Sequence, residues 1–343
     1  MNLLSILFGY WSATFIHEVA HLTTFRLRRI NIRALYIWPL ILYKKDKKWK
    51  FKFRQINILT FGGIVIPDLH IIRDNQDLNR LRKDFAAVMI AAPITSILFN
   101  VILSLLFLLN HSILYGELKV IGLFYCIGVS ICTVFITLTS CIKGKGMYGD
   151  YAAYFMLKKD RCFVAYVAYQ YLCFSSAYRK EMHSFIRNKV LEGIKEAYNN
   201  KYFSEVIFDC VNILVSEYLT GKIKGMPLSA HQYIMLIKQK YRQLLIYNNS
   251  EALRILLYNL VPYFYRGLKD ESKARILHQY LDQYIYIKDK VCVYYHKRNQ
   301  HILGINKLDV YMRQPKNIMN SMLYQLINLF DEHYEDEWSI MGI

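Results

Sequence analysis

Residues 15–25 read Phe-Ile-His17-Glu18-Val-Ala-His21-Leu-Thr-Thr-Phe, and this stretch indicates both the chemistry and the fold of the chain. His17 and His21 are four residues apart, so they lie on one face of a helix, where two imidazoles can bind one metal ion. Glu18 follows the first histidine and is placed to take a proton from a metal-bound water. The pattern H-E-x-x-H predicts a zinc-dependent hydrolase with one Zn²⁺ ion. Two histidines that fill a helix core are the alternative.

The segment around the motif is apolar and long enough to cross a membrane. Between Leu3 and Phe25 the only acidic or basic side chains are His17, Glu18 and His21. Such groups are costly inside a bilayer unless they pair, and a metal ion is a natural partner. The first basic residue is Arg26 and no small-residue cleavage site follows, so we expect a retained span and not a signal peptide.

Composition supports a membrane part joined to a soluble part. The 343 residues are 54% apolar and carry a net charge of +18. Residues 26–54 hold eleven Lys and Arg against Asp46 alone. Because this run lies between hydrophobic stretches, it is typical of a cytoplasm-facing loop and does not indicate nucleic-acid binding. The seven cysteines include no C-x-x-C pair, which favours buried thiols over disulfides or a second metal site.

The rest of the first half predicts two further spans and a small β structure. The spans are expected at about 85–109 and 118–141, after a first span at about 3–25. The apolar segments 34–43 and 56–66 are too short to cross as helices, so they predict a membrane-associated β-hairpin. Its exposed edge near Gly62 and Gly63 would accept an extended peptide, although an ordinary glycine turn is the alternative.

Asp150 is the predicted third zinc ligand. The third span returns the chain to the side of the two histidines, and the glycine-broken segment 144–151 can aim one side chain inward. Three protein ligands would leave the fourth position for water. Two alternatives remain: Asp150 caps the helix that follows it, or His70, near Asp68, is the third ligand.

The chain divides into three predicted parts. Residues 1–160 form the membrane core, 161–178 an apolar linker that is interfacial or a fourth span, and 179–343 a helical domain. Apolar residues recur at helical spacing in 182–198, 202–218, 230–247, 250–265, 271–286 and 317–333. The fold class is therefore an all-α membrane protein with a helical, repeat-like carboxyl-terminal domain suited to docking a protein partner.

Taken together, these motifs resemble the site-2 protease family of intramembrane zinc metalloproteases. The resemblance covers about residues 8–157 and rests on His17-Glu18-x-x-His21, Phe61-Gly62-Gly63, Ala92-Pro93 with Asn100, and Asp150, in that order. It implies a three-helix transmembrane core, zinc held by His17, His21 and Asp150, and Glu18 as general base. It also implies substrates that are membrane-spanning helices or membrane-bound peptides, with contacts at Gly62, Gly63, Pro93 and Asn100.

Three departures mark the chain as a divergent member. Ala92-Pro93 stands where the family usually has Gly-Pro, Gly149-Asp150 stands for Asp-Gly, and an Asn-x-x-Pro element before the aspartate is missing. The expected protein is an integral plasma-membrane protease with its site toward the cytoplasm. The alternative is a catalytically idle relative that serves as a membrane scaffold in peptide export or immunity.

Overall fold

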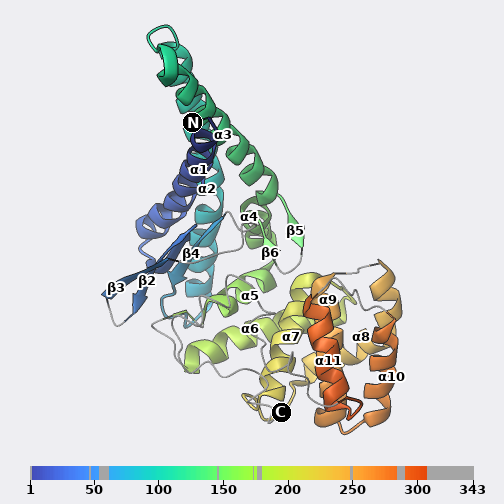
Figure 1. Cartoon of the computed structure of the whole chain (residues 1–343). Helices are drawn as coiled ribbons and strands as arrows, with labels where there is room; N and C mark the ends of the chain where they lie inside the picture. The colour runs from blue at the N-terminus through green and yellow to red at the C-terminus, as the bar shows by residue number, and fades with distance from the viewer. Residues whose placement is uncertain are drawn as a thin grey trace. The chain divides into compact units, whose positions relative to one another are not determined.

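A computed structural model describes residues 2–45, 48–53, 62–144, 147–172, 174–175, 180–247, 250–283 and 290–306. These residues form two compact units, the first within 2–143 and 147–186 and the second mainly within 187–306. The first unit holds three long helices, a small sheet and two short helices, and the second is helical (Figure 1).

The three long helices of the first unit are α1 (Asn2–Leu27), α2 (Asn75–Asn110) and α3 (Gly116–Ser140). Each is long and apolar enough to cross a membrane, so the three predicted spans correspond to three candidate membrane-spanning helices. They run alongside one another in Figure 1, and α1 packs against both α2 and α3. Ala13 of α1 meets Val129 and Cys132 of α3 in a buried core, whereas Leu105 and Ile131 are more than half exposed on the outside. An apolar outer face is what a lipid environment requires.

The predicted small antiparallel structure is confirmed, but it has four strands instead of two. These are β1 (Asn31–Ile37), β2 (Leu40–Lys45), β3 (Lys48–Phe53) and β4 (Gly63–Asp68), in the order β3-β2-β1-β4. A turn at Trp38-Pro39 divides the segment 34–43 into β1 and β2. The basic stretch after it is itself a strand, because its lysines and aromatics alternate with the period of two that a strand imposes. Residues 54–61 lie outside the described part of the chain.

A short two-stranded ladder and two short helices follow α3. The ladder is β5 (Lys143–Gly144) with β6 (Met147–Tyr148), and the helices are α4 (Asp150–Lys159) and α5 (Arg161–Leu172). Twelve helical residues rise only about 18 Å, which is less than the ~30 Å hydrocarbon core of a bilayer. Phe163, Val164 and Ala165 of α5 are buried, and α5 packs against α4, α2 and β4. It is therefore a packed helix of the first unit.

The second unit is built from helices, as its periodicity predicts. After α6 (Lys180–Asn199) come α7 (Glu205–Leu219), α8 (Leu228–Tyr247), α9 (Glu251–Pro262) with a π-helical turn η1 (Tyr263–Gly267), α10 (Glu271–Asp282) and α11 (Lys290–Ile302). Helix α9 is nearly all buried and packs against α7, α10 and α11. The first four predicted segments match described helices, and so does 271–286 as far as residue 282. Helix α11 was not predicted, and residues 284–286 and 317–333 lie outside the described residues. The repeat-like arrangement stays a prediction.

Candidate metal centre

Three metal-ligating side chains meet inside the first unit. His17 and His21 project from α1, and Asp150 opens α4 far along the chain. His17 Nε2 lies 3.0 Å and His21 Nε2 3.4 Å from the same oxygen, Asp150 Oδ2. The ligand atoms of all three residues lie within 4.8 Å of one another, and this is the only such cluster among the described residues.

The other ring nitrogen of each histidine is held by α2. His17 Nδ1 lies 3.0 Å from Ser96 Oγ, and His21 Nδ1 lies 3.2 Å from the carbonyl oxygen of Val88. The Ser96 hydroxyl donates to the carbonyl of Ala92, so its oxygen is free to accept from the imidazole. Such partners fix both the ring orientation and the tautomer, which leaves the two Nε2 atoms as metal donors.

A tight turn brings Asp150 to the histidines. Gly149 N donates to the carbonyl of Ile142, and a Cβ atom at Gly149 would lie 2.2 Å from the carbonyl oxygen of Thr139. Only glycine therefore lets the chain fold back on the end of α3 so closely. Gly149 occupies the N-cap position of α4 and Asp150 is its first residue, so the Asp150 carboxylate is not the helix cap.

Electrostatics keep Asp150 in the form that binds a cation. Burial by itself raises the pKa of the Asp150 carboxyl, but His21 and His17 beside it outweigh burial, so this pKa lies well below its usual range. The carboxylate is therefore ionised over the whole physiological range.

Glu18 lies next to the cluster and is buried. Its side chain is 4% exposed, and its Oε2 makes no hydrogen bond within the described part of the chain. A buried carboxylate oxygen without a partner is costly, so this position suits a group that handles a water molecule. The backbone of Gly63, at the start of β4, packs directly against the Glu18 side chain.

The donor set fits a zinc ion of the catalytic type. Two imidazole nitrogens and one carboxylate oxygen are a usual three-ligand set, and they leave one position open for water or substrate. The competing ligand pair does not join this cluster. His70 is exposed and its Nε2 lies 2.6 Å from the carbonyl oxygen of Arg29, while Asp68 ends β4.

The four positions expected to contact a substrate are spread over β4 and α2. Gly62 precedes β4 and its carbonyl accepts from Trp38 N, Pro93 is buried inside α2, and Asn100 Oδ1 accepts from Ser130 Oγ on α3. Their role toward a substrate stays a prediction. Sequence reasoning did not find Ser96 or Val88, because contacts across 79 and 67 residues leave no local pattern.

Comparison with known proteins supplies the family. Residues 5–265, more than half of the chain, match the model of a family described as "Peptidase family M50". Searches of curated proteins and of solved structures gave no match. The three apolar helices and this match make the chain an integral membrane protein. It belongs to peptidase family M50, the site-2 protease family that its sequence resembles, whose members are intramembrane metalloproteases.

Proposed function

We propose that this protein is an intramembrane zinc metalloendopeptidase that cleaves a membrane-spanning helix or a membrane-bound peptide. The observation that carries the proposal is the meeting of His17, His21 and Asp150 beside the buried Glu18, among helices suited to a bilayer. His17, His21 and Asp150 would hold the ion. When bound, zinc polarises the scissile carbonyl and acidifies a coordinated water.

Glu18 is assigned the proton transfers. Its carboxylate takes a proton from the attacking water and delivers it to the leaving nitrogen, the usual work of a general base that then acts as an acid. Burial keeps bulk water from this carboxylate, and the close backbone of Gly63 fixes where it lies. Ser96 and Val88 hold the imidazoles in place during these steps.

We assign peptide binding to the free edge of β4. Among the described residues this strand ends the sheet order β3-β2-β1-β4, so an added strand would pair with its outer edge. A peptide paired there would pass close to Glu18, because Gly63 of β4 touches the Glu18 side chain. A helical substrate must unwind before cleavage, and the new backbone hydrogen bonds would offset those it loses.

We assign the protein to the plasma membrane with its site toward the cytoplasm, and the charge pattern supports this orientation. Arg26 lies in the last turn of α1, Arg28 and Arg29 follow that helix, and Lys143 follows α3, as the positive-inside rule expects of cytoplasmic ends. Strand β3 supports association of the sheet with the membrane surface. Trp49, Phe51 and Phe53 form one exposed face of it, and lysines form the other.

A protein partner is assigned to the second unit. Ile246 and Tyr247, at the end of α8, are 69% and 87% exposed, and exposed apolar side chains of this size suit a protein contact.

The test compares cells that carry the intact chain with cells that carry Glu18→Gln, which removes the base and keeps the side-chain volume against Gly63. We expect one or a few membrane proteins or peptides to accumulate uncut only in the Glu18→Gln cells, and the purified variant to retain one zinc per chain. Matching profiles, under conditions in which deletion of the gene has a phenotype, would favour the catalytically idle scaffold instead.

A further inference from the structure

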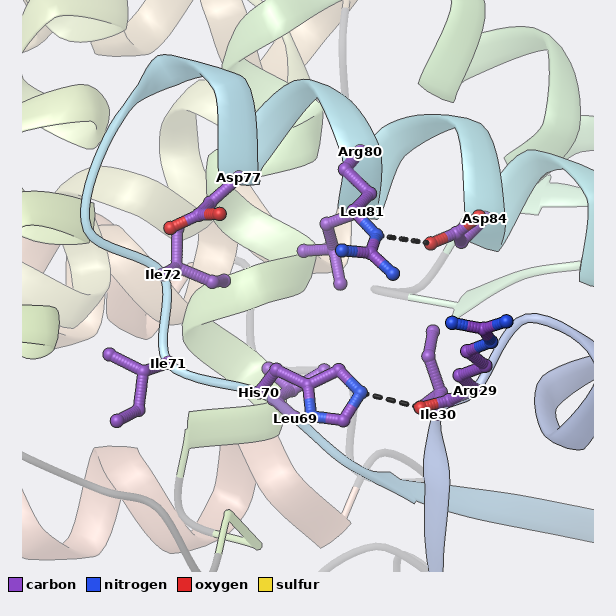
Figure 2. A pocket seen from close by; sticks show the side chains of 10 residues that line it. All are labelled: Arg29, Ile30, Leu69, His70, Ile71, Ile72, Asp77, Arg80, Leu81 and Asp84. Carbon is purple, nitrogen blue, oxygen red and sulfur yellow. Dashed lines mark hydrogen bonds and ion pairs between the residues drawn. The ribbon is translucent and has the colours of Figure 1, made fainter.

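A pocket lies in the first unit, away from the zinc ligands, where α1 ends and α2 begins. It encloses about 400 Å³, a volume typical of small-ligand sites. Its walls come from the turn after α1, the loop after β4 and the first turns of α2 (Figure 2). Arg29 and Arg80 reach from two of these walls toward the same space, close to Asp84.

The ends of α1 and α2 put the pocket where we expect lipid headgroups. The first ten residues of α2, 75–84, are almost all polar, and the apolar run begins at Phe85. The apolar part of α1 ends at Phe25, directly before Arg26, Arg28 and Arg29. Since both helices change from apolar to polar here, the pocket opens where a bilayer changes from hydrocarbon to headgroups.

Cations outnumber carboxylates in and around this pocket. Arg29 and Arg80 line it, and an adjoining hollow that shares Arg80 adds Arg28 and Lys83. The acidic residues are Asp77 and Asp84. One oxygen of Asp77 already accepts from the backbone N–H of Arg73, at 2.9 Å.

The arginines keep donors for a ligand. Arg28 and Arg80 lie 3.7 Å and 3.9 Å from Asp84, which is close enough for attraction but too far for a hydrogen bond. Within the described part of the chain, the Arg29 side chain makes no hydrogen bond or ion pair. Guanidinium groups pair with phosphate oxygens through two parallel N–H donors, so these residues match a phosphate better than an amine or a metal.

The remaining lining is apolar. Leu69, Ile72 and Leu81 are buried and form walls beside the charged side chains. A charged mouth with apolar walls matches an amphiphile and is less suited to a free inorganic ion. We propose that this pocket binds the phosphate of an anionic phospholipid headgroup from the surrounding bilayer.

The pocket also touches the helices that carry the candidate metal centre. The Arg28–Asp84 ion pair joins α1 to α2, one helical turn along α2 from Val88, whose carbonyl holds His21. A headgroup bound between Arg28, Arg29 and Arg80 would therefore stabilise the spacing of α1 and α2 near His21. The binding proposal is independent of whether the chain cleaves peptides.

The test measures lipid binding to the purified full chain in detergent by native mass spectrometry. The probe is dioctanoyl phosphatidylglycerol, with dioctanoylglycerol as the ligand that lacks phosphate and inorganic phosphate as competitor. The site variant is Arg29→Asn with Arg80→Gln, since asparagine tolerates the positive φ of 61° at position 29. The matched control is Lys222→Gln with Lys224→Gln, which removes the same charge from exposed positions in the turn after α7.

We expect the site variant to weaken phosphatidylglycerol binding at least tenfold, the control to change it less than twofold, and dioctanoylglycerol not to bind. Arg80 is 66% exposed, so its replacement should leave folding intact. Arg29→Asn alone serves if the double variant does not fold. Competition by equimolar inorganic phosphate would overturn the lipid assignment and indicate a soluble phosphate as the ligand. Unchanged binding in the site variant, or equal loss in the control, would overturn the proposal.

Discussion

Gly63 and Glu18 are in direct contact: a Cβ atom at Gly63 would lie 2.2 Å from Glu18 Cγ and 2.6 Å from its Oε1. No side chain of any size fits there unless Glu18 moves. The strand that ends the sheet and the proposed general base are thus fixed against each other. A Cβ atom added at Gly62, the preceding residue, would meet no other atom within 4 Å.

Gly63→Ala should therefore inactivate the protein without emptying its metal site. A shift of about 1 Å in a reacting group can cost roughly a hundredfold in rate, and we expect at least that loss for cleavage of the substrate found with Glu18→Gln. Zinc content, measured by atomic absorption, should not change because Glu18 is not a ligand. Gly62→Ala is the matched control and should keep most of its activity. Equal activity in the two variants would contradict this role of the contact.

Ser96→Ala should weaken zinc binding. The substitution removes the hydroxyl beside His17 Nδ1, and loss of such a supporting hydrogen bond typically costs about 10- to 100-fold in metal affinity. Thr95→Ala is the control, because among the described residues the Thr95 hydroxyl bonds only to the carbonyl of Ala91 in its own helix. Competition with a chelator measures both affinities. If the two variants lose zinc at the same chelator concentration, Ser96 does not position His17.

The sequence predicts those parts of the molecule that depend on residues close together in the chain. Apolar runs of membrane length predict the spans, and the spacing of His17, Glu18 and His21 predicts one helical face. Asp150 could be predicted because three crossings return the chain to the side of the histidines. The contacts of Ser96 and Val88 with the histidines could not be predicted, because they depend on how α1 packs against α2. The Val88 contact also uses a backbone carbonyl, which every residue has.

Two elements, β3 and α11, were not predicted from the sequence because their charged residues are of types usually found in loops or at the surface. The high charge of Lys48–Phe53 suggested a loop, although its strict alternation is that of a strand. Helix α11 contains Arg298, a residue type normally found at the surface, yet Arg298 is 1% exposed. Its guanidinium lies over the ring of Tyr295 and donates to Asn259, contacts that exist only in the folded unit.

Trp49 should report on the position of β3 at the membrane. In the proposed arrangement the exposed face of Trp49, Phe51 and Phe53 enters the bilayer interface, where tryptophan is favoured. Replacing Trp49 with phenylalanine in proteoliposomes should remove a blue-shifted emission component that brominated lipids quench. Emission typical of a water-exposed indole, unaffected by brominated lipids, would place this strand in water.

Mild acid should loosen the contact between α10 and α11. The buried rings of His278 and His296 stack there, with centroids 4.6 Å apart. Burial, together with the neighbouring His296, lowers the pKa of His278 to about 4. Burial also lowers the pKa of His296, although Asp282, 3.2 Å away, opposes this shift.

The sign of the effect follows from proton binding. An unfolded histidine has a pKa near 6.5, so the unfolded chain binds protons that the folded one does not. The stability that the two neutral rings contribute is therefore complete above about pH 6.5, and it is lost progressively as the pH falls toward about 4. Amide hydrogen exchange, corrected for its intrinsic pH dependence, should become faster in α10 and α11 at pH 5 than at pH 7, with α7 as internal reference. His278→Phe should reduce this difference in exchange rate between pH 5 and pH 7. Equal protection of α10 and α11 at both pH values in the intact chain would show that the two rings do not control the contact between these helices.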